Sequence, residues 1–222
     1  MITIVGPLCR DSVEYLNIEF QNIKGLVIAL DGGIKLLQMV DKVPDLWFGD
    51  MDSASQDEIK ALDGKEVKIF QYPPEKDYSD FELALQYLDQ HHQGFDPVSL
   101  YGMLGGRMDH MLINLSLVKA YLPGIEKLCF CSQTLDVYLL NSKNTLTLSS
   151  FPGRLISLIP FGKAVKVNFT SGLKYPLIQE TLKSGSSRGL SNVSVSHEVV
   201  IEIIEGNLLV FHYKEVYNEN FS

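Results

Sequence analysis

The chain has 222 residues, of which 45% are hydrophobic, and this is enough to bury the core of one large domain or two small ones. Its formal net charge of −8 argues against general binding to nucleic acid or to an anionic membrane. The charge still permits an anionic substrate, because a metal ion and a few local basic residues can reverse the field inside a cleft.

The N-terminus and the cysteines predict a cytoplasmic protein. Residues 1–6 read as a strand and lack the basic region and the long apolar run of a secretory signal. No uninterrupted apolar run approaches the length that spans a membrane. The three cysteines, Cys9, Cys129 and Cys131, are an odd number that fits reduced thiols better than a disulfide framework. Cys129 and Cys131 share one face of a strand-like run without the spacing of a zinc site, so we expect them to pack in the core.

Short apolar runs alternate with helical patterns over the first two-thirds of the chain. The predicted strands are 2–5, 26–30, 46–48, 67–70, 98–101 and 127–131. The predicted helices are 11–20, 34–40, 54–62, 79–91 and 109–121. Repeated strand–helix units predict an α/β fold, with a mostly parallel sheet and helices on both of its faces.

The pattern changes near Gln133, where the helical periodicity stops. Short runs rich in Val, Ile, Leu and Thr follow at 137–140, 145–148, 155–159, 164–169, 193–196, 199–204 and 208–213. Residues 205–207 read as a hairpin turn between the last two runs. The sequence therefore predicts an α/β domain over residues 1–132 and an all-β domain, a sandwich or partial barrel, over residues 133–222.

Two turns after early predicted strands carry acidic residues. Ligands bind at the carboxyl ends of the strands in an open α/β sheet. The turn Asp31-Gly32-Gly33 lets backbone N–H groups approach an anion, although a plain strand–helix turn explains it equally well. Asp50 and Asp52 lie one residue apart, which suits two oxygen ligands on one hard cation such as Mg²⁺. The alternative is a pair of solvated aspartates that cap a helix.

A third turn adds a cation and further carboxylates. Ser79 and Glu82 have the spacing of a capping box, which leaves Lys76, Asp77 and Asp80 to be explained. Lys76 could hold a phosphate as a point charge, and Asp80 could supply another metal ligand.

The fourth turn contains Gly105-Gly106-Arg107 and precedes a predicted helix. Arg107 offers a planar fork that suits a phosphate. Asp109 could simply cap the helix, and Asn114 lies one helical turn later. The chain has no Walker A loop, so the sequence does not predict an ordinary P-loop kinase.

In this order the motifs resemble those of the thiamine pyrophosphokinase family along nearly the whole chain. The residues that match are Asp31-Gly32-Gly33, Pro44-Asp45, 49–53, Lys76-Asp77, Ser79-Asp80, Glu82, Gly105-Gly106-Arg107, Asp109-His110, Asn114, 157–160, 170–177 and Ser191-Asn192. In two places the chain departs from the family pattern: Ser79 stands where Thr is usual, and Tyr175 stands where Trp is common.

The resemblance implies a homodimer in which ATP donates a pyrophosphoryl group to thiamine with Mg²⁺ as cofactor. It implies metal ligation by Asp50, Asp52 and Asp80, with one of these or Asp77 as possible proton acceptor. The ATP-binding residues that it implies are Asp31, Gly32, Gly33, Lys76, Ser79, Arg107, Asp109, His110 and Asn114. The thiamine-binding residues that it implies are Thr170, Ser171, Gly172, Leu173, Tyr175, Ser191 and Asn192.

Two other functions are compatible with parts of this pattern. A hydroxymethylpterin pyrophosphokinase on a related core would not need the β domain and its segment at 170–175. A non-catalytic nucleotide-binding regulatory protein would not need every carboxylate of the acidic set.

Overall fold

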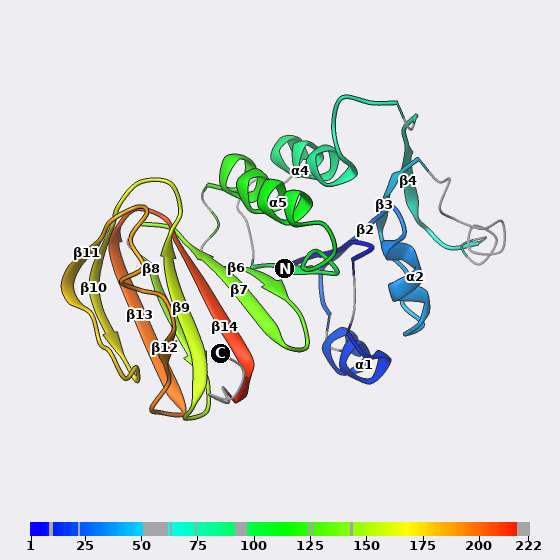
Figure 1. Ribbon diagram of the computed structural model, residues 1–222. Coiled ribbons are helices and arrows are strands. Elements are labelled where there is room, and N and C mark those ends of the chain that lie inside the picture. Colours follow the sequence, from blue (N-terminus) through cyan, green and yellow to red (C-terminus); the bar gives the residue numbers. More distant parts are fainter. Residues whose placement is uncertain are drawn as a thin grey trace. The chain divides into compact units, whose positions relative to one another are not determined.

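The protein is described by a computed structural model that covers residues 1–8, 11–21, 23–50, 62, 64–73, 75–91, 97–123, 125, 127–142 and 144–216. The chain forms two compact units, shown in Figure 1. The first contains residues 1–125 and 130–132, and the second contains residues 126–129 and 133–222. The division therefore falls within strand β6 (Leu128–Cys131).

The first unit is built on parallel strands. Its elements are β1 (Ile2–Val5), α1 (Val13–Gln21), β2 (Leu26–Leu30), α2 (Gly33–Gln38), β3 (Leu46–Gly49), β4 (Lys68–Gln71), α4 (Asp80–His91), β5 (Val98–Tyr101) and α5 (Met108–Tyr121). The strands lie in the order β5-β1-β2-β3-β4, and each neighbouring pair is parallel. The predicted parallel sheet with helices is confirmed. The predicted helix at 54–62 lies outside the described residues except for Leu62.

Strand β3 shows why this sheet is covered on both faces. Successive side chains of a strand point to opposite faces, and both Trp47 and Phe48 are fully buried. Trp47 packs in a cluster with Leu16 and Phe20 of α1 and with residues of α2. Phe48 stacks on Phe70 at 4.4 Å between ring centroids and meets the ring of Tyr87 from α4 at 5.8 Å. Helices α1 and α2 therefore cover one face, and α4 covers the other.

The second unit is an antiparallel sandwich. Its strands are β7 (Leu135–Leu140), β8 (Asn144–Ser149), β9 (Arg154–Pro160), β10 (Val165–Ser171), β11 (Ile178–Leu182), β12 (Asn192–Val193), β13 (Glu198–Glu205) and β14 (Leu208–Val216). One layer has the order β12-β9-β14-β7 and the other β11-β10-β13-β8. Alternate residues of both layers, such as Ile156, Val167 and Ile201, meet in one buried cluster. The predicted all-β sandwich is confirmed.

The predicted hairpin at residues 205–207 is wrong. Strand β13 pairs with β10 and β8, whereas β14 pairs with β7 and β9. The chain therefore passes from one layer of the sandwich to the other through Gly206. The φ of Gly206 is 100°, a conformation that favours glycine, and this is why the turn resembles a hairpin turn in sequence. Turn chemistry predicted the change of direction correctly but not the pairing, which is decided by contacts distant in sequence.

Among the helices that the structure describes, none combines the length and the apolar character needed to cross a bilayer.

A buried histidine lies within the second unit. His212 of β14 has an exposed fraction of 3%, and its Nε2 lies 3.2 Å from Ser150 Oγ. Burial, together with the positive charges of Arg154 and Lys214, lowers the pKa of His212 from 6.5 to about 4. The folded protein therefore holds this imidazole in its neutral form at pH 7.

We expect His212 to make the protein sensitive to acid. In the unfolded chain His212 takes up a proton near pH 6.5, and in the folded chain only near pH 4. The free energy of unfolding is therefore unaffected by the titration of this residue above pH 6.5 and decreases as the pH falls from 6.5 towards 4. The loss should reach up to about 3 kcal/mol. Urea unfolding at pH 7 and pH 4.5 should show a smaller fall in the free energy of unfolding for His212→Gln than for the wild type. His197→Gln, at an exposed histidine, should keep the wild-type dependence; an identical dependence in His212→Gln would contradict the expectation.

Candidate active site

The parallel strands of the first unit end at one edge of the sheet. Val5 of β1 is in register with Ala29 of β2 and Tyr101 of β5, and Gly49 of β3 is in register with Gln71 of β4. The turns that follow these strands therefore leave the sheet at the same edge, which is where ligands bind in open α/β sheets. The described residues of the four turns predicted to carry the chemistry follow strands that end at this edge.

The turn after β2 is held tightly against its neighbours. Asp31 has a left-handed φ of 43°, its N–H donates to Phe48 O at 2.7 Å, and its carbonyl accepts from Trp47 Nε1 at 3.0 Å. A Cβ built on Gly33 would lie 2.0 Å from Val5 O, so only glycine lets α2 pack this closely on β1. The structure thus gives Gly33 a packing role. The support that Trp47 gives to Asp31 was not predicted, and its only sequence signal is a buried strand that ends beside an acidic turn.

The turn after β3 carries Asp50 beside the turn of Asp31. A Cβ on Gly49 would lie 3.1 Å from the Cα of Asp31, so the two backbones are in close contact. The N–H of Tyr72 donates to Gly49 O at 3.0 Å, so the start of the third turn lies beside the end of β3, opposite the turn of Asp31. Asp52, the second carboxylate predicted here, lies outside the described residues.

The third turn brings a cation and a carboxylate together. Lys76 Nζ donates to Asp80 Oδ1 in an i,i+4 ion pair and lies 5.5 Å from the ring centroid of Tyr72. Lys76 and Asp80 were predicted as separate phosphate and metal groups, and in this structure they neutralise each other. The side chains of Lys76 and Asp80 keep 16% and 22% of their surface exposed, so a more highly charged ligand can reach both.

The predicted capping box at Ser79 is half formed. Ser79 Oγ accepts from the N–H of Glu82 at 3.2 Å, while Glu82 Oε1 accepts from Tyr121 OH at 2.9 Å. Glu82 therefore ties α4 to α5. Asp77, the alternative proton acceptor, is exposed.

Arg107 and Asp109 form an exposed bidentate pair at the start of α5. Arg107 Nε donates to Asp109 Oδ1 at 3.1 Å, and its Nη2 lies 2.5 Å from Oδ2. Hydrogen bonding to Arg107 lowers the pKa of Asp109 to about 2. The carboxylate of Asp109 therefore holds the Arg107 guanidinium in one orientation at the edge of the sheet. Of the other predicted residues in this turn and helix, His110 is exposed and Asn114 is buried.

The predicted acceptor residues lie in the second unit, around the loop between β10 and β11. Tyr175 is 52% exposed, and Ser171 and Ser191 are exposed as well. Thr170 and Asn192 are 4% exposed, and their polar atoms are hydrogen bonded to the backbone of the loop. The structure therefore brings these residues together while giving them different surroundings.

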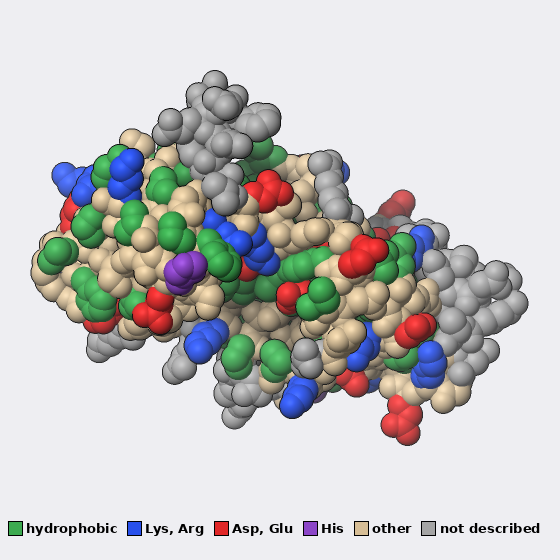
Figure 2. Space-filling view, turned by 90° about the horizontal axis from the view of Figure 1, so that it is seen from below, with side chains coloured by type: hydrophobic (Ala, Val, Ile, Leu, Met, Phe, Trp, Pro, Cys, Tyr) green, Lys and Arg blue, Asp and Glu red, His purple; other side chains and the backbone are tan. Residues whose placement is uncertain are grey.

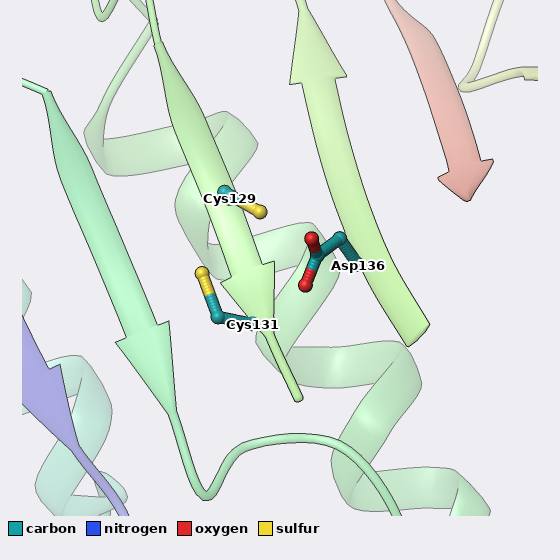
Figure 3. Close-up of side chains that lie close together, drawn as sticks. All are labelled: Cys129, Cys131 and Asp136. Carbon is teal, nitrogen blue, oxygen red and sulfur yellow. The ribbon is translucent and has the colours of Figure 1, made fainter. Parts of the chain in front are cut away.

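One further cluster of possible metal ligands lies outside these turns. The ligand atoms of Cys129 and Cys131 from β6 and of Asp136 from β7 lie within 4.8 Å of one another (Figure 3). Asp136 Oδ1 lies 2.8 Å from Lys214 Nζ, and Oδ2 accepts from Tyr138 OH at 3.3 Å. A cation would have to compete with the Lys214 ammonium for this carboxylate, so we assign the cluster no catalytic role.

Sequence and structure comparisons point to one family. Residues 19–127 match the family model described as thiamin pyrophosphokinase, catalytic domain, and residues 143–208 match the one described as thiamin pyrophosphokinase, vitamin B1 binding domain. The chain is 27% identical over 197 residues to thiamine pyrophosphokinase of Bacillus subtilis (strain 168), a match that covers 84% of this chain and 83% of that protein.

Solved structures share the fold. The crystal structure of thiamine pyrophosphokinase from Bacillus subtilis superposes with a TM-score of 0.79 at 23% identity and covers 97% of this chain and 99% of that one. Thiamin pyrophosphokinase from Candida albicans gives a TM-score of 0.78 at 16% identity, over 96% of this chain and 88% of that one. The α/β unit with its acidic sheet edge and the sandwich define a transferase with separate catalytic and binding regions. The chain belongs to the thiamin pyrophosphokinase family.

Proposed function

We propose that this chain transfers an intact pyrophosphoryl group from ATP to the hydroxyethyl oxygen of thiamine, giving thiamine diphosphate and AMP. The observation that carries the proposal is the presence of both family regions, catalytic and vitamin B1 binding, in order along one chain. The chain is accordingly an enzyme, a thiamine diphosphokinase.

The reaction exchanges one P–O bond for another. The thiamine oxygen attacks the β-phosphorus of ATP, and the bond from that phosphorus to the oxygen of AMP breaks roughly in line with the attack. The hydroxyl proton leaves the thiamine oxygen, and AMP departs as an anion. Little covalent chemistry falls to the protein, so catalysis depends on positioning and on neutralising phosphate charge.

The acidic edge of the sheet fits a magnesium ion. Proteins hold Mg²⁺ through one or two carboxylates together with waters and substrate phosphates. Asp50 and Asp80 lie at neighbouring turns and can fill that role, together with Asp52 outside the described residues. When bound, Mg²⁺ supplies positive charge that offsets the negative charge developing on the phosphates. We assign Asp77, which is exposed near Asp80, as the alternative acceptor of the hydroxyl proton.

The basic residues at the same edge support ATP binding. Lys76 and Arg107 are each paired with a carboxylate, and a polyphosphate can compete for both cations because it carries more charge. Asp31, Gly32 and Gly33 line the neighbouring turn, and Ser79, Asp109, His110 and Asn114 complete the proposed ATP set.

An assay for AMP tests the proposed reaction directly. AMP should form from ATP and Mg²⁺ only when thiamine is present, and thiamine diphosphate should appear in equal amount. AMP that forms only with a hydroxymethylpterin would favour that pyrophosphokinase instead. The absence of AMP with either acceptor would favour a non-catalytic nucleotide-binding protein.

We expect Arg107→Lys to weaken ATP use despite the retained charge. Lysine cannot make the two parallel hydrogen bonds of the guanidinium fork, so the KM for ATP should rise about tenfold. Arg188→Lys is a matched control, because Arg188 makes a similar two-point pair with Glu180 in the other unit, with distances of 2.8 and 3.0 Å. An unchanged KM for ATP in Arg107→Lys would refute the role.

We expect Tyr175→Ala to weaken thiamine use. An exposed aromatic ring can stack on the flat rings of thiamine and attract its cationic thiazolium, by about 0.5–2 kcal/mol, so the KM for thiamine should rise roughly 3- to 30-fold. Ser171, Gly172 and Ser191 complete the proposed acceptor region. Leu173, also predicted as a thiamine contact, is 5% exposed and anchors this region in the core of the sandwich. Tyr213→Ala, at a tyrosine of the same unit with an exposed fraction of 39%, should leave this KM unchanged. A loss of stability in Tyr175→Ala without a change in KM would mean that the pocket lies elsewhere.

We also propose a cytoplasmic homodimer that binds neither nucleic acid nor membrane. Met108, Leu112 and Ile113 of α5 have exposed fractions of 71%, 56% and 51%, and a second subunit could cover such a surface. On the face shown in Figure 2, Lys and Arg side chains are interspersed with acidic and hydrophobic ones, which supports the expectation that nucleic acid is not bound. Light scattering after gel filtration tests the dimer.

A further inference from the structure

The loop that presents Tyr175 is fixed at both of its ends. Gly172 has a φ of 75°, and a Cβ there would lie 2.2 Å from Glu198 O. Leu173 and Leu177 are buried in the core of the sandwich, with exposed fractions of 5% and 1%. Tyr175 lies midway between these two anchors and is exposed.

Backbone hydrogen bonds hold the same loop from two sides. The N–H of Lys174 donates to Val193 O at 2.8 Å, and the N–H of Val195 donates to Gly172 O at 2.8 Å. The strand-like pairing continues between Leu173 and Ser194. These hydrogen bonds involve the backbone of Gly172 and Lys174. The backbone N–H and C=O of Tyr175 are instead hydrogen bonded by a side chain.

That side chain is Asn192. Its Nδ2 donates to Tyr175 O at 2.7 Å, and its Oδ1 accepts from the N–H of Tyr175 at 3.0 Å. The same Oδ1 accepts from the N–H of Val193 at 2.9 Å. One buried amide, 4% exposed, therefore fixes both backbone polar groups of the exposed tyrosine.

Thr170 closes the loop from the other end. Its Oγ1 accepts from the N–H of Leu177 at 2.9 Å, and its own N–H donates to Leu177 O at 2.8 Å. With an exposed fraction of 4%, Thr170 presents almost no surface to a ligand. Its hydroxyl, like the amide of Asn192, is hydrogen bonded to the backbone of the loop.

We propose that Asn192 and Thr170 are positioning residues, which hold the Tyr175 ring ready for the acceptor and make no contact with it. The inference rests on the proposed thiamine pyrophosphokinase activity, and it changes the role of two residues that the family resemblance placed among the thiamine contacts. A ring that is already ordered loses less conformational entropy when a ligand stacks on it. Loosening the loop should therefore weaken thiamine binding, and at most by as much as removing the ring does.

A double-mutant cycle tests this dependence. Asn192→Ala should raise the KM for thiamine about 3- to 10-fold, with kcat and the KM for ATP changed less than about twofold. In a Tyr175→Ala background the same substitution should raise the KM by less than about twofold, because the ring that it positions is gone. If the two effects multiply, Asn192 contacts thiamine directly and the proposal is overturned.

Matched variants separate positioning from general damage. Asn144→Ala removes an asparagine of the same unit whose Oδ1 accepts from the N–H of Thr145 at 2.8 Å, and the KM for thiamine should not change. Thermal melting checks that each variant folds. If Asn192→Ala does not fold, the comparison moves to Thr170: Thr170→Val, which lacks the hydroxyl, should raise the KM more than Thr170→Ser, and this difference should vanish in the Tyr175→Ala background. An equal rise in both, or a difference that persists without the ring, would overturn the proposal.

The activity of the wild type is measured first. If thiamine-dependent AMP is absent, the proposed function fails. If it is present while the effects of Asn192→Ala and Tyr175→Ala multiply, only the positioning role fails.

Discussion

Replacing Asp80 with asparagine is expected to lower kcat on the order of 10²- to 10³-fold. Asparagine keeps the shape of the side chain but removes the charge that would hold Mg²⁺ against the ATP phosphates. Loss of one group that stabilises transition-state charge typically costs about 2.7–4 kcal/mol. Asp50→Asn should behave similarly, because Asp50 leaves the neighbouring strand at the same edge of the sheet.

Asp80 also has a structural partner, so the experiment needs a control for stability. Asp80→Asn breaks the ion pair with Lys76 and removes an acidic residue from the first turn of α4, which should cost about 1 kcal/mol or less at a partly exposed site. Asp89→Asn changes an exposed aspartate on the same helix and should leave kcat unchanged. Turnover is measured over a range of Mg²⁺ concentrations. Near-normal kcat in both Asp50→Asn and Asp80→Asn, at an unchanged Mg²⁺ requirement, would remove these residues from the metal site.

The sequence predicted the inner strands of the parallel sheet well because they are short and mostly buried. Strands β1, β2 and β5 begin and end where the apolar runs do, and the acidic and glycine-rich turns follow the strands at one edge. Parallel strands necessarily bring their carboxyl ends together, so placing these turns at one edge needed no knowledge of side-chain contacts.

Strand β11 was missed because little of it is buried. In Ile178–Leu182 only Leu182 is buried, and Ile178 has an exposed fraction of 72%. A strand at the edge of a sheet can be polar on both faces, so it shows no alternation of apolar and polar residues. Its position is set by pairing with β10, which the local sequence does not encode.

Side-chain partners in the candidate site were the least predictable feature. Lys76 precedes α4, which begins at Asp80, so the spacing rule for helix surfaces does not predict their ion pair. The bonds from Asn192 to Tyr175 join residues 17 positions apart, and they exist only because β12 lies beside the loop after β10. Residue type predicted polar character at Asn192, whereas the fold decided that the polar atoms face the backbone.

Trp47 is expected to be the most damaging single truncation in the first unit. Its side chain is fully buried in the cluster formed with α1 and α2, and its Nε1 donates to Asp31 O at 3.0 Å. Trp47→Ala should lower the free energy of unfolding by about 3–5 kcal/mol, because it leaves a large cavity and removes the indole donor. Trp47→Phe keeps most of the ring and should cost less.

The indole also supports the candidate site, so the two substitutions should separate packing from positioning. Trp47→Phe removes the bond that holds the left-handed Asp31 turn, and we expect the KM for ATP to rise a few-fold while the protein remains folded. Ile69→Ala is the control: Ile69 is in register with Trp47 on β4 but has an exposed fraction of 45%, and its truncation should cost about 1 kcal/mol or less. Because Trp47 is the single tryptophan of the chain, unfolding is followed by far-ultraviolet circular dichroism rather than by fluorescence. A cost for Trp47→Ala no larger than that for Ile69→Ala would mean that the core on this face of the sheet does not depend on the indole.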